Sequence, residues 1–462
     1  MTELSVFAPD DQQELGVLPV DGAASVDAKV ARAIRAMEHW SVTSPMLRAE
    51  ALIQIWSATR EQLPGLAAAL SKEQGKTLKE AHMELERYLG PFLQYAGLAT
   101  TVAGKYQRLG PEVAGLVERV PVGVAVGIVP WNFPASLFGS KVAPALAAGC
   151  AFLIKPAETT PLITLRLAEI AQQFLPDGLV DVVIGGADVG DALVTHRDVA
   201  RIAFTGSTAV GREIAARAGH GLKRVSLELG GCDPFVLLDD ADVPSAVRAL
   251  AGSRFYNAGQ VCVAPKRLVV HEKVADEALS LLESRLGRIV PGPGLDGSST
   301  MGPVHTDRVR ATLEDQIADA VDRGAVLVGG GRPAGASVAR GWFVNPALVV
   351  DPPPDARVRC EETFGPVLTV IRVRDDEEAV AVANETPYGL GASVWSGDQS
   401  RAVAIARRVD SGYAWVNALG RVYDELPFGG VKASGTGREH GVEALDSYLE
   451  DRTFIMPAAP RG

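Results

Sequence analysis

Between Val122 and Leu238 the sequence alternates between short apolar runs and longer segments with helical periodicity. The apolar runs predict strands, and the segments between most of them predict helices. This alternation predicts an α/β fold with a parallel sheet covered by helices on both faces, and such sheets bind ligands at the carboxyl ends of their strands. The expected strands are Val124–Val129, Ala151–Ile154, Val180–Ile184, Arg201–Phe204, Arg224–Leu227 and Phe235–Leu238, and the expected helices include Ser136–Ala148, Leu162–Phe174 and Ala209–Ala218.

The rest of the chain suggests further domains, because 462 residues are too many for one hydrophobic core. Helical patterns run from about Val26 to Val102, and alternating runs separated by a glycine-proline turn predict a hairpin from Gly104 to Val120. A second region rich in strand and helix patterns extends from Cys232 to Val431. The tail from Leu445 to Met456 ends in an apolar run suited to a strand.

Composition and charge argue against several kinds of partner. The formal net charge of −11 disfavours nucleic acid and anionic membranes, because both bind basic faces. No apolar stretch reaches the roughly 20 residues of a membrane helix, and the N-terminus lacks a signal-peptide pattern, so we expect a cytoplasmic protein. The histidines form no HxxxH pair and the cysteines no CxxC pair, so we expect no metal site and no disulfide framework. The cysteines are Cys150, Cys232, Cys262 and Cys360.

One cysteine lies in a stretch suited to a reactive residue. The segment from Asn257 to Arg267 follows a helical pattern, contains Gly259 and precedes the strand-like run Leu268–His271. Cys262 is therefore expected on a loop between two rigid elements, where a nucleophile is both positioned and accessible. The alternative is a buried structural cysteine, since free cysteines are among the most buried residues.

A glycine turn after the predicted strand at Arg201–Phe204 suggests an anion site. Gly206, Ser207 and Thr208 precede a predicted helix, whose first backbone N–H groups attract phosphate. The spacing to Gly211 is Gly-x4-Gly instead of the usual dinucleotide fingerprint, so the alternative is an ordinary capped turn.

Polar residues also follow three other predicted strands. Lys155 and Glu158 suit the hydroxyls of a ribose, and a carboxylate there favours NAD over NADP because it repels a 2′-phosphate. Asn132 is suited to donate to an oxyanion, and Glu228 ends an apolar strand where burial would raise its pKa toward that of a general base. The alternatives are a solvated charge pair, a turn residue and a salt-bridged structural carboxylate, respectively.

Together these stretches resemble the NAD(P)-dependent aldehyde dehydrogenases. The resemblance runs from about Glu73 to Met456, and its motifs occur in the order and at the separations of that family. The motifs are Phe204-Thr-Gly-Ser-Thr, Glu228-Leu-Gly-Gly, Gly259-Gln-Val-Cys262, Glu362-Thr-Phe364-Gly-Pro and Pro427-Phe-Gly-Gly-Val-Lys-x-Ser-Gly-x-Gly-Arg438-Glu.

The resemblance implies a role for each residue. Cys262 would be the nucleophile, Glu228 the general base, and Asn132 the oxyanion donor together with the Cys262 backbone N–H. Lys141 matches a lysine that the family keeps near the active site. Lys155 and Glu158 would bind the adenosine ribose, Glu362 the nicotinamide ribose, and Phe364 would pack near the nicotinamide. The implied cofactor-binding set is Pro130, Trp131, Lys155, Glu158, Gly206, Ser207, Gly211, Leu229, Glu362 and Phe364.

The implied reaction oxidises an aldehyde to the carboxylic acid with NAD, or alternatively NADP. A thiolate adds to the aldehyde, hydride leaves to the nicotinamide, and a water activated by Glu228 hydrolyses the thioester. One alternative is a CoA-acylating aldehyde dehydrogenase, although such an enzyme has little use for Glu228. A more remote alternative is a non-catalytic binding or structural relative, which would not need Cys262, Glu228 and Asn132 together.

The resemblance also implies an architecture and an assembly. We expect a Rossmann-type cofactor-binding domain, an α/β catalytic domain and a small β oligomerisation element, in a homodimer or homotetramer. The boundaries are residues 1–103 and 123–231 for the cofactor domain, 232–433 for the catalytic domain, and 104–122 and 434–462 for the oligomerisation element. The short segment before the first helix suggests that one strand pair of the family is abbreviated or missing.

The substrate is less constrained. The Cys262 and Val431 motifs look closest to the succinate-semialdehyde dehydrogenase branch, where an arginine before the active-site lysine often binds a distal carboxylate. Here Ser140 has that position, and Arg421 is a candidate substitute; small residues at Gly139 and Ser140 suit instead a wider pocket for a longer or aromatic aldehyde. The expected pocket residues are Phe133, Leu137, Ser140, Val261, Val263 and Arg421. Cys232 replaces a common family lysine, which we interpret as the loss of a structural contact.

Overall fold

A six-stranded sheet forms the first half of the protein in the computed structural model, which describes residues 2–418 and 420–458. Its order is β17-β9-β8-β5-β6-β7, and all neighbours are parallel except β17, which runs antiparallel to β9. Five strands predicted between Val122 and Leu238 are therefore confirmed as parallel neighbours. The strands are β5 (Val124–Ile128), β6 (Phe152–Lys155), β7 (Val180–Val182), β8 (Val199–Thr205), β9 (Arg224–Glu228) and β17 (Gly435–Thr436).

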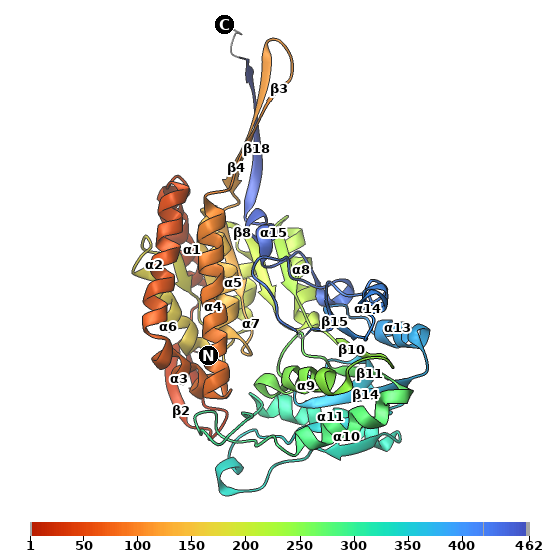
Figure 1. The fold of residues 1–462 in the computed structure, drawn as a ribbon. Helices are drawn as coiled ribbons and strands as arrows, with labels where there is room; N and C mark the ends of the chain where they lie inside the picture. Colours follow the sequence, from red (N-terminus) through yellow and green to blue (C-terminus); the bar gives the residue numbers. More distant parts are fainter. Residues whose placement is uncertain (1, 419, 459–462) are drawn as a thin grey trace.

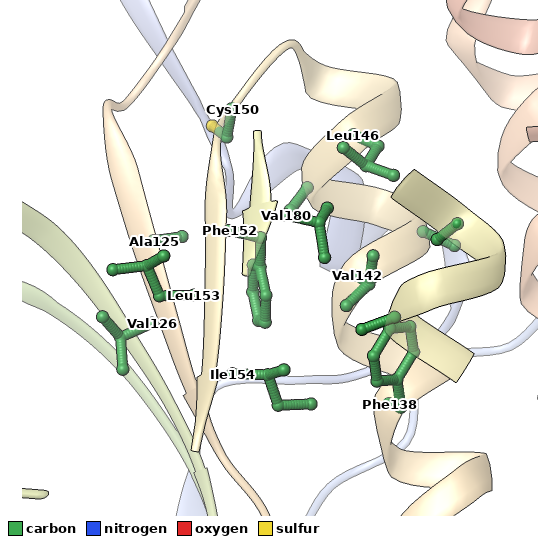
Figure 2. Close-up of a cluster of buried hydrophobic side chains, with 14 of the residues drawn as sticks. Ala125, Val126, Phe138, Val142, Leu146, Cys150, Phe152, Leu153, Ile154 and Val180 are labelled. Carbon is green, nitrogen blue, oxygen red and sulfur yellow. The ribbon is translucent and has the colours of Figure 1, made fainter. Parts of the chain in front are cut away.

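Helices cover this sheet, and a buried apolar core joins them to it. Figure 2 shows Phe138 and Val142 of α5 lying toward Phe152 and Ile154 of β6. A second helix, α4, packs on the outer side of α5 at Gly139, where a side chain would collide with the Tyr88 carbonyl. The helices of this half are α1 (Ala23–Trp40), α2 (Pro45–Glu61), α3 (Leu63–Gln74), α4 (Leu78–Ala99), α5 (Pro134–Ala148), α6 (Pro161–Gln172), α7 (Ala187–Thr195) and α8 (Thr208–His220).

A seven-stranded sheet forms the second half, in the order β12-β13-β14-β11-β10-β15-β16. Only β12 is antiparallel to its neighbour. The predicted strand at Phe235–Leu238 belongs here as β10, not to the first sheet, because it pairs with β11 and β15. The strands are β10 (Pro234–Leu237), β11 (Arg267–His271), β12 (Val326–Gly329), β13 (Ala347–Val350), β14 (Val367–Val373), β15 (Gly391–Trp395) and β16 (Tyr413–Val416).

Short and long helices connect these strands and pack on the second sheet (Figure 1). They are α9 (Val243–Arg254), the 3-10 turn η1 (Tyr256–Gly259), α10 (Glu272–Leu286), α11 (Asp307–Asp322), η2 (Ala336–Val338), α12 (Arg357–Cys360), α13 (Asp376–Asn384) and α14 (Gln399–Ala406). Beyond them, η3 (Lys432–Ser434), β17 and α15 (Gly441–Asp446) return to the first sheet. Residues 435–436 of the expected oligomerisation element therefore extend the first sheet instead.

Three antiparallel strands form an arm that extends away from the rest of the protein (Figure 1). They are β3 (Lys105–Arg108), β4 (Val113–Pro121) and β18 (Leu449–Pro457), in the order β18-β4-β3. Leu449 pairs with Pro121 at one end and Pro457 with Val113 at the other. The predicted hairpin and C-terminal strand are confirmed, and the arm joins segments from opposite ends of the sequence.

The segment before the first helix contains one antiparallel strand pair, β1 (Glu3–Phe7) and β2 (Glu14–Pro19). Val6 is fully buried in this pair. Across the described residues, none of the helices is both long and apolar enough to cross a membrane.

Candidate active site

The Cys262 loop begins with three consecutive residues in the left-handed backbone region. Asn257 and Ala258 each have φ of 52°, and Gly259 has φ of 73°. This conformation costs free energy for residues other than glycine, so surrounding contacts must hold it. A Cβ at position 259 would collide with the Gly365 carbonyl, so only glycine fits there. The turn ends α9 and leaves Cys262 half-buried on a loop before β11, as predicted.

Hydrogen bonds from distant segments hold this strained turn. The Asn257 N–H donates to Glu80 Oε1 at 2.7 Å, and its side-chain amide donates to the Asn132 carbonyl at 3.0 Å. Gln260 Nε2 donates to the Asn257 carbonyl at 3.0 Å, and its Oε1 accepts the His305 N–H at 2.7 Å. The loop before Cys262 is therefore fixed on both sides by buried polar groups.

Asn132 lies directly beside this loop. Its Nδ2 donates to the Gln260 carbonyl at 3.0 Å, and its own carbonyl accepts from the buried Lys76 Nζ at 2.9 Å. Lys76 also forms a fully buried ion pair with Glu84, whose other oxygen accepts the Ala135 N–H at the start of α5. An amide has two N–H donors, and within the described residues only one of those on Asn132 has an acceptor. The second is free to donate to a substrate oxygen.

The Cys262 thiol is protonated at neutral pH in this form. Burial raises its pKa to about 12, while the nearby charge of Lys266 acts in the opposite direction. Reaction as a nucleophile therefore requires the thiol to lose its proton first.

Glu228 ends β9 and is almost completely buried. Neither carboxyl oxygen has a hydrogen-bond partner within the described residues. Burial, and then the negative charge of Glu439, raise the pKa of Glu228 well above its ordinary value, whereas Lys141 lowers it. A buried carboxyl without a partner is costly for the fold, so its position is better explained by chemistry than by structure.

Lys141 lies on α5 and forms a buried ion pair with Glu439. Its Nζ also donates to Thr205 Oγ1 at 2.8 Å, at the carboxyl end of β8. Ser140 donates to the other oxygen of Glu439 at 3.1 Å. Glu439 therefore has two electrostatic partners: it pairs with the positive charge of Lys141, and its negative charge raises the pKa of Glu228.

The expected anion site lies at the amino end of α8. Ser207 is the N-cap and accepts the Val210 N–H at 3.4 Å, which leaves the N–H groups of Ser207, Thr208 and Ala209 without acceptors among the described residues. The Leu229 side chain, directly after β9, packs against Gly211 in the first turn of α8 and leaves no room for a larger residue there. Free N–H groups at the start of a 13-residue helix fit a pyrophosphate.

Lys155 is the last residue of β6, and Glu158 lies three residues beyond it. Lys155 is buried, and its Nζ donates to the Pro156 carbonyl at 3.2 Å and lies 3.5 Å from Glu158 Oε1. The Glu158 side chain is 44% exposed, so its carboxylate remains available to a ligand.

The other expected cofactor residues form a second group. Glu362 accepts the Gly231 N–H at 3.2 Å and lies 3.6 Å from Lys266 Nζ. Trp131, which follows Pro130 after β5, contacts Phe364 edge-on with ring centroids 5.5 Å apart, and its other contact is a stack on His305 at 4.7 Å. The acceptor carboxylate of Glu362 and these aromatic faces fit the nicotinamide half of a dinucleotide.

Four expected pocket residues lie in one apolar cluster, which includes both chain neighbours of Cys262. Phe133, Leu137, Val261 and Val263 belong to one apolar cluster, in which Tyr256 stacks on Phe133 with ring centroids 5.9 Å apart. The structure does not bring Ser140 and Arg421 into this cluster. Ser140 is buried against Glu439, and Arg421 is exposed, with its guanidinium over the Tyr423 ring. Gly139 adds no width to the pocket, because α4 occupies the space beside it.

Cys232 is buried and is not part of the nucleophile loop. Its thiol donates to the carbonyls of Glu361 and Arg359, at 3.5 and 3.7 Å. The cysteine thus contacts the segment that leads to Glu362.

Several residues of the site were missed in the sequence. Glu439 directly follows Arg438 in the last family motif. Its ion pair with Lys141 joins residues that are far apart in the sequence, so no local pattern predicts it. Asn257 and Gln260 both precede the expected nucleophile by a few residues, and this closeness in the sequence was the only signal that could have identified them. Lys76 and His305 carry no local signal, because their contacts to the site come only from tertiary packing. In the part of the chain that the structure describes, no three His, Cys, Asp or Glu side chains are arranged to hold a metal ion.

Comparison with known proteins gives consistent matches over the whole chain. Residues 1–454 match the sequence profile of the Aldehyde dehydrogenase family. The succinate-semialdehyde dehydrogenase [NADP(+)] GabD of Escherichia coli K12 is 37% identical, covering 97% of this chain and 93% of its own length. The phenylacetaldehyde dehydrogenase of Pseudomonas fluorescens is 39% identical, covering 98% and 92%. The crystal structure of PnpE from Pseudomonas sp. WBC-3 is 37% identical, with a TM-score of 0.96, covering 100% and 96%.

Proposed function

Because the chain belongs to the aldehyde dehydrogenase family, and is thus an NAD(P)-dependent oxidoreductase that converts aldehydes to acids, we propose that Cys262 is its nucleophile and Glu228 its general base. The observation that carries this assignment is the unpaired, buried carboxyl of Glu228 in the same site as the half-buried thiol of Cys262. Gly231, three residues after Glu228, lies beside the Cys262 carbonyl, which supports the proximity of the two groups.

The first half-reaction places a covalent adduct on Cys262. The thiolate adds to the aldehyde carbon, and the free N–H of Asn132 and the backbone N–H of Cys262 stabilise the resulting oxyanion. Bound NAD(P)+ supplies the hydride acceptor. Loss of hydride from the adduct leaves a thioester on Cys262, and the surrounding Phe133, Val261 and Val263 exclude bulk water from it.

The second half-reaction uses Glu228. In its ionised form this carboxylate takes a proton from water, and the hydroxide equivalent attacks the thioester to release the acid and the Cys262 thiol. The raised pKa makes Glu228 a stronger base than an exposed carboxylate, because burial disfavours its charged form. This role favours hydrolysis over transfer of the acyl group to CoA.

Cys262→Ala tests the nucleophile, with NADH or NADPH formation followed at 340 nm. The proposal requires this variant to lose turnover while the matched variant Cys360→Ala, at another half-buried thiol, retains it. Adding CoA to the wild-type protein distinguishes acyl transfer from hydrolysis, because only an acylating enzyme would need it. Wild-type rates from Cys262→Ala would refute the assignment.

For the cofactor we propose a preference for NAD over NADP. The partly exposed carboxylate of Glu158 at the end of β6 supports it, since this charge repels a 2′-phosphate. The Lys155–Glu158 pair leaves less positive charge for a phosphate than Lys155 alone would offer.

For the substrate we propose an aldehyde with a distal carboxylate, bound by Arg421. This arginine follows Gly420, which lies beside the Val263 carbonyl. Since Val263 belongs to the apolar cluster next to Cys262, this contact brings the segment with Arg421 to the edge of that cluster. Arg421 has a contact to the Tyr423 ring but no carboxylate partner within the described residues. The relative GabD acts on succinate semialdehyde by its name, in agreement with this class.

A second candidate is an aromatic aldehyde. The stacked rings of Phe133 and Tyr256 favour it, because offset stacking adds to the burial of an aromatic substrate. Comparison of succinate semialdehyde, hexanal and phenylacetaldehyde as substrates separates the candidates. Arg421→Gln should raise KM only for the carboxylated substrate, whereas Arg407→Gln, at another exposed arginine, should leave all three unchanged.

For the assembly we propose a homodimer or homotetramer formed through the arm of β3, β4 and β18. The arm projects from the body and exposes large apolar side chains, among them Tyr106, Leu109 and Ile455. Such surfaces on a protruding sheet are costly in water unless another chain covers them. Sedimentation of Ile455→Asp beside the wild-type protein tests this, and an unchanged mass would contradict it.

A further inference from the structure

Lys266 is completely buried directly behind the nucleophile loop. Its Nζ donates to the carbonyl of Val261 at 2.9 Å and to the carbonyl of Cys262. The same Nζ lies 3.6 Å from Glu362 Oε1. One ammonium group therefore contacts both peptide units around Cys262 and the carboxylate expected to bind the cofactor.

The hydrogen bond to Val261 fixes the direction of a second group. The Val261 carbonyl and the Cys262 N–H belong to one planar trans peptide, so they point in opposite directions. Since Lys266 holds the carbonyl, the Cys262 N–H faces away from Lys266. Within the described residues this N–H has no acceptor, so it is free to donate to a bound oxygen.

Lys266 also places a positive charge in a group of acids. Besides Lys266, the carboxyls of Glu362, Asp233 and Glu228 act on the Cys262 thiol. Two further cations belong to this group, because Arg254 acts on Glu362 and Arg267 acts on Asp233. Burial raises the pKa of Asp233 to about 7, and Lys266 is the largest opposing influence on both Asp233 and Glu362. Lys266 is the largest influence that favours the Cys262 thiolate, and it opposes the effect of burial.

We propose that Lys266 is a positioning residue, which orients the Cys262 N–H as an oxyanion donor and holds a compensating charge beneath the thiolate. This inference rests on the proposed role of Cys262 and deepens it. The contacts give Lys266 a second role, because its charge lies 3.6 Å from Glu362 Oε1 and opposes the rise in the pKa of Glu362 that burial causes. A buried lysine needed only for packing would have no reason to contact all three groups.

The test measures thiol reactivity instead of turnover. Cys262 is alkylated with iodoacetamide between pH 6 and pH 11 in wild type, Lys266→Met, Lys266→Arg and Lys273→Met, and its peptide is followed by mass spectrometry. Methionine removes the charge at similar length, and arginine keeps the charge. Lys273 is an exposed lysine in the same half of the protein, paired with Asp239, and serves as the matched control.

Below the thiol pKa the alkylation rate rises about tenfold per pH unit with the thiolate fraction. Loss of the charge should raise this pKa by at least about one unit, so Lys266→Met should react about tenfold more slowly than wild type at each pH below it. Lys266→Arg should keep the wild-type position of the profile but lose on the order of tenfold in kcat, since the guanidinium cannot reproduce both carbonyl contacts. Lys273→Met should match the wild type in both measurements. A wild-type profile in folded Lys266→Met, or an equal shift in Lys266→Arg, would overturn the proposal.

These outcomes are separable from failure of the proposed function. If Cys262 is not the nucleophile, Cys262→Ala keeps its turnover whatever the alkylation profiles show. If only the role of Lys266 is wrong, Cys262→Ala is inactive and the profiles of the Lys266 variants coincide with the wild type. Melting curves identify any variant that fails to fold. If Lys266→Met does not fold, Lys266→Arg still tests the proposal, because it should keep the wild-type alkylation profile and lose kcat.

Discussion

Lys141 and Glu439 form a buried ion pair beside Glu228, and the two charges act on the pKa of Glu228 in opposite directions. Glu439 raises this pKa and Lys141 lowers it. Thr205 and Ser140 hold the two partners by hydrogen bonds of 2.8 and 3.1 Å. Burial is the main cause of the raised pKa of Glu228, and this ion pair, whose members come from α5 and from the segment before α15, adjusts it further.

Replacing Glu439 tests this relationship. Glu439→Gln removes the negative charge that raises the pKa of Glu228, so Glu228 should ionise at lower pH. The acidic limb of the rate of thioester hydrolysis, measured after the NADH burst, should therefore move to lower pH. The exposed Glu443→Gln, which follows on the same stretch, should leave the limb in place.

An unchanged or higher midpoint in Glu439→Gln would contradict this role for the ion pair. Because the change also leaves Lys141 without its partner, the variant should lose on the order of 3 kcal/mol of stability. Rates are therefore compared well below its melting temperature.

Glu228→Gln should stabilise the fold at and above neutral pH. The pKa of Glu228 is raised in the native protein, so between the ordinary carboxyl pKa and this raised value the native chain holds a proton that the unfolded chain has released. The contribution of Glu228 to the free energy of unfolding therefore falls as pH rises across that window. Glutamine does not ionise, so the variant avoids this loss of stability. The melting temperature of the variant should exceed that of wild type at pH 8, and the difference should shrink toward pH 5.

Asn132→Ala should lower kcat by about 100- to 1,000-fold, as expected when one oxyanion donor is lost. Since Asn132 also helps to hold the Cys262 loop through the Gln260 carbonyl, alkylation of Cys262 serves as the control for its position. Alkylation at the wild-type rate together with the loss of kcat indicates an effect on the oxyanion. A variant with wild-type kcat would exclude Asn132 from that role.

Glu158→Gln should reduce discrimination against NADP. Without its negative charge, a 2′-phosphate meets less repulsion, so the ratio of kcat/KM for NAD to that for NADP should fall on the order of tenfold, or about 1.4 kcal/mol. Glu169→Gln, at an exposed acid on α6, is the matched control. A ratio that stays constant in Glu158→Gln would show that other groups set the preference.

Much of this site was accessible from sequence, because its residues follow strands and glycine turns. Asn132, Lys155 and Glu228 stand at the ends of apolar runs, so the sheet edge brings them to one side. The loop position of Cys262 was predicted from its glycine and the strand after it, whereas its role as nucleophile came from the family resemblance. In these cases local pattern and tertiary position agree.

The rest depended on contacts that no local pattern encodes. The alternating pattern grouped the strand at β10 with the first sheet, whereas the expected domain boundary at residue 232 placed it in the catalytic domain. The pattern misled here because an apolar run does not specify its neighbours. Ser140 and Gly139 suggested an open pocket, but Glu439 and α4 occupy the space beside them. Lys266, four residues after Cys262, drew no prediction from the sequence, and its role rests on the contacts of its Nζ with the loop carbonyls.

The most direct test of the account is to trap the acyl group on Cys262. Glu228→Gln is mixed with phenylacetaldehyde or succinate semialdehyde and NAD, quenched in acid, and examined by intact and peptide mass spectrometry. The account predicts a burst of one NADH per active site and one acyl group on the Cys262 peptide, since hydrolysis lacks its base. Continued turnover at the wild-type rate, or an acyl group on another cysteine such as Cys360, would contradict it.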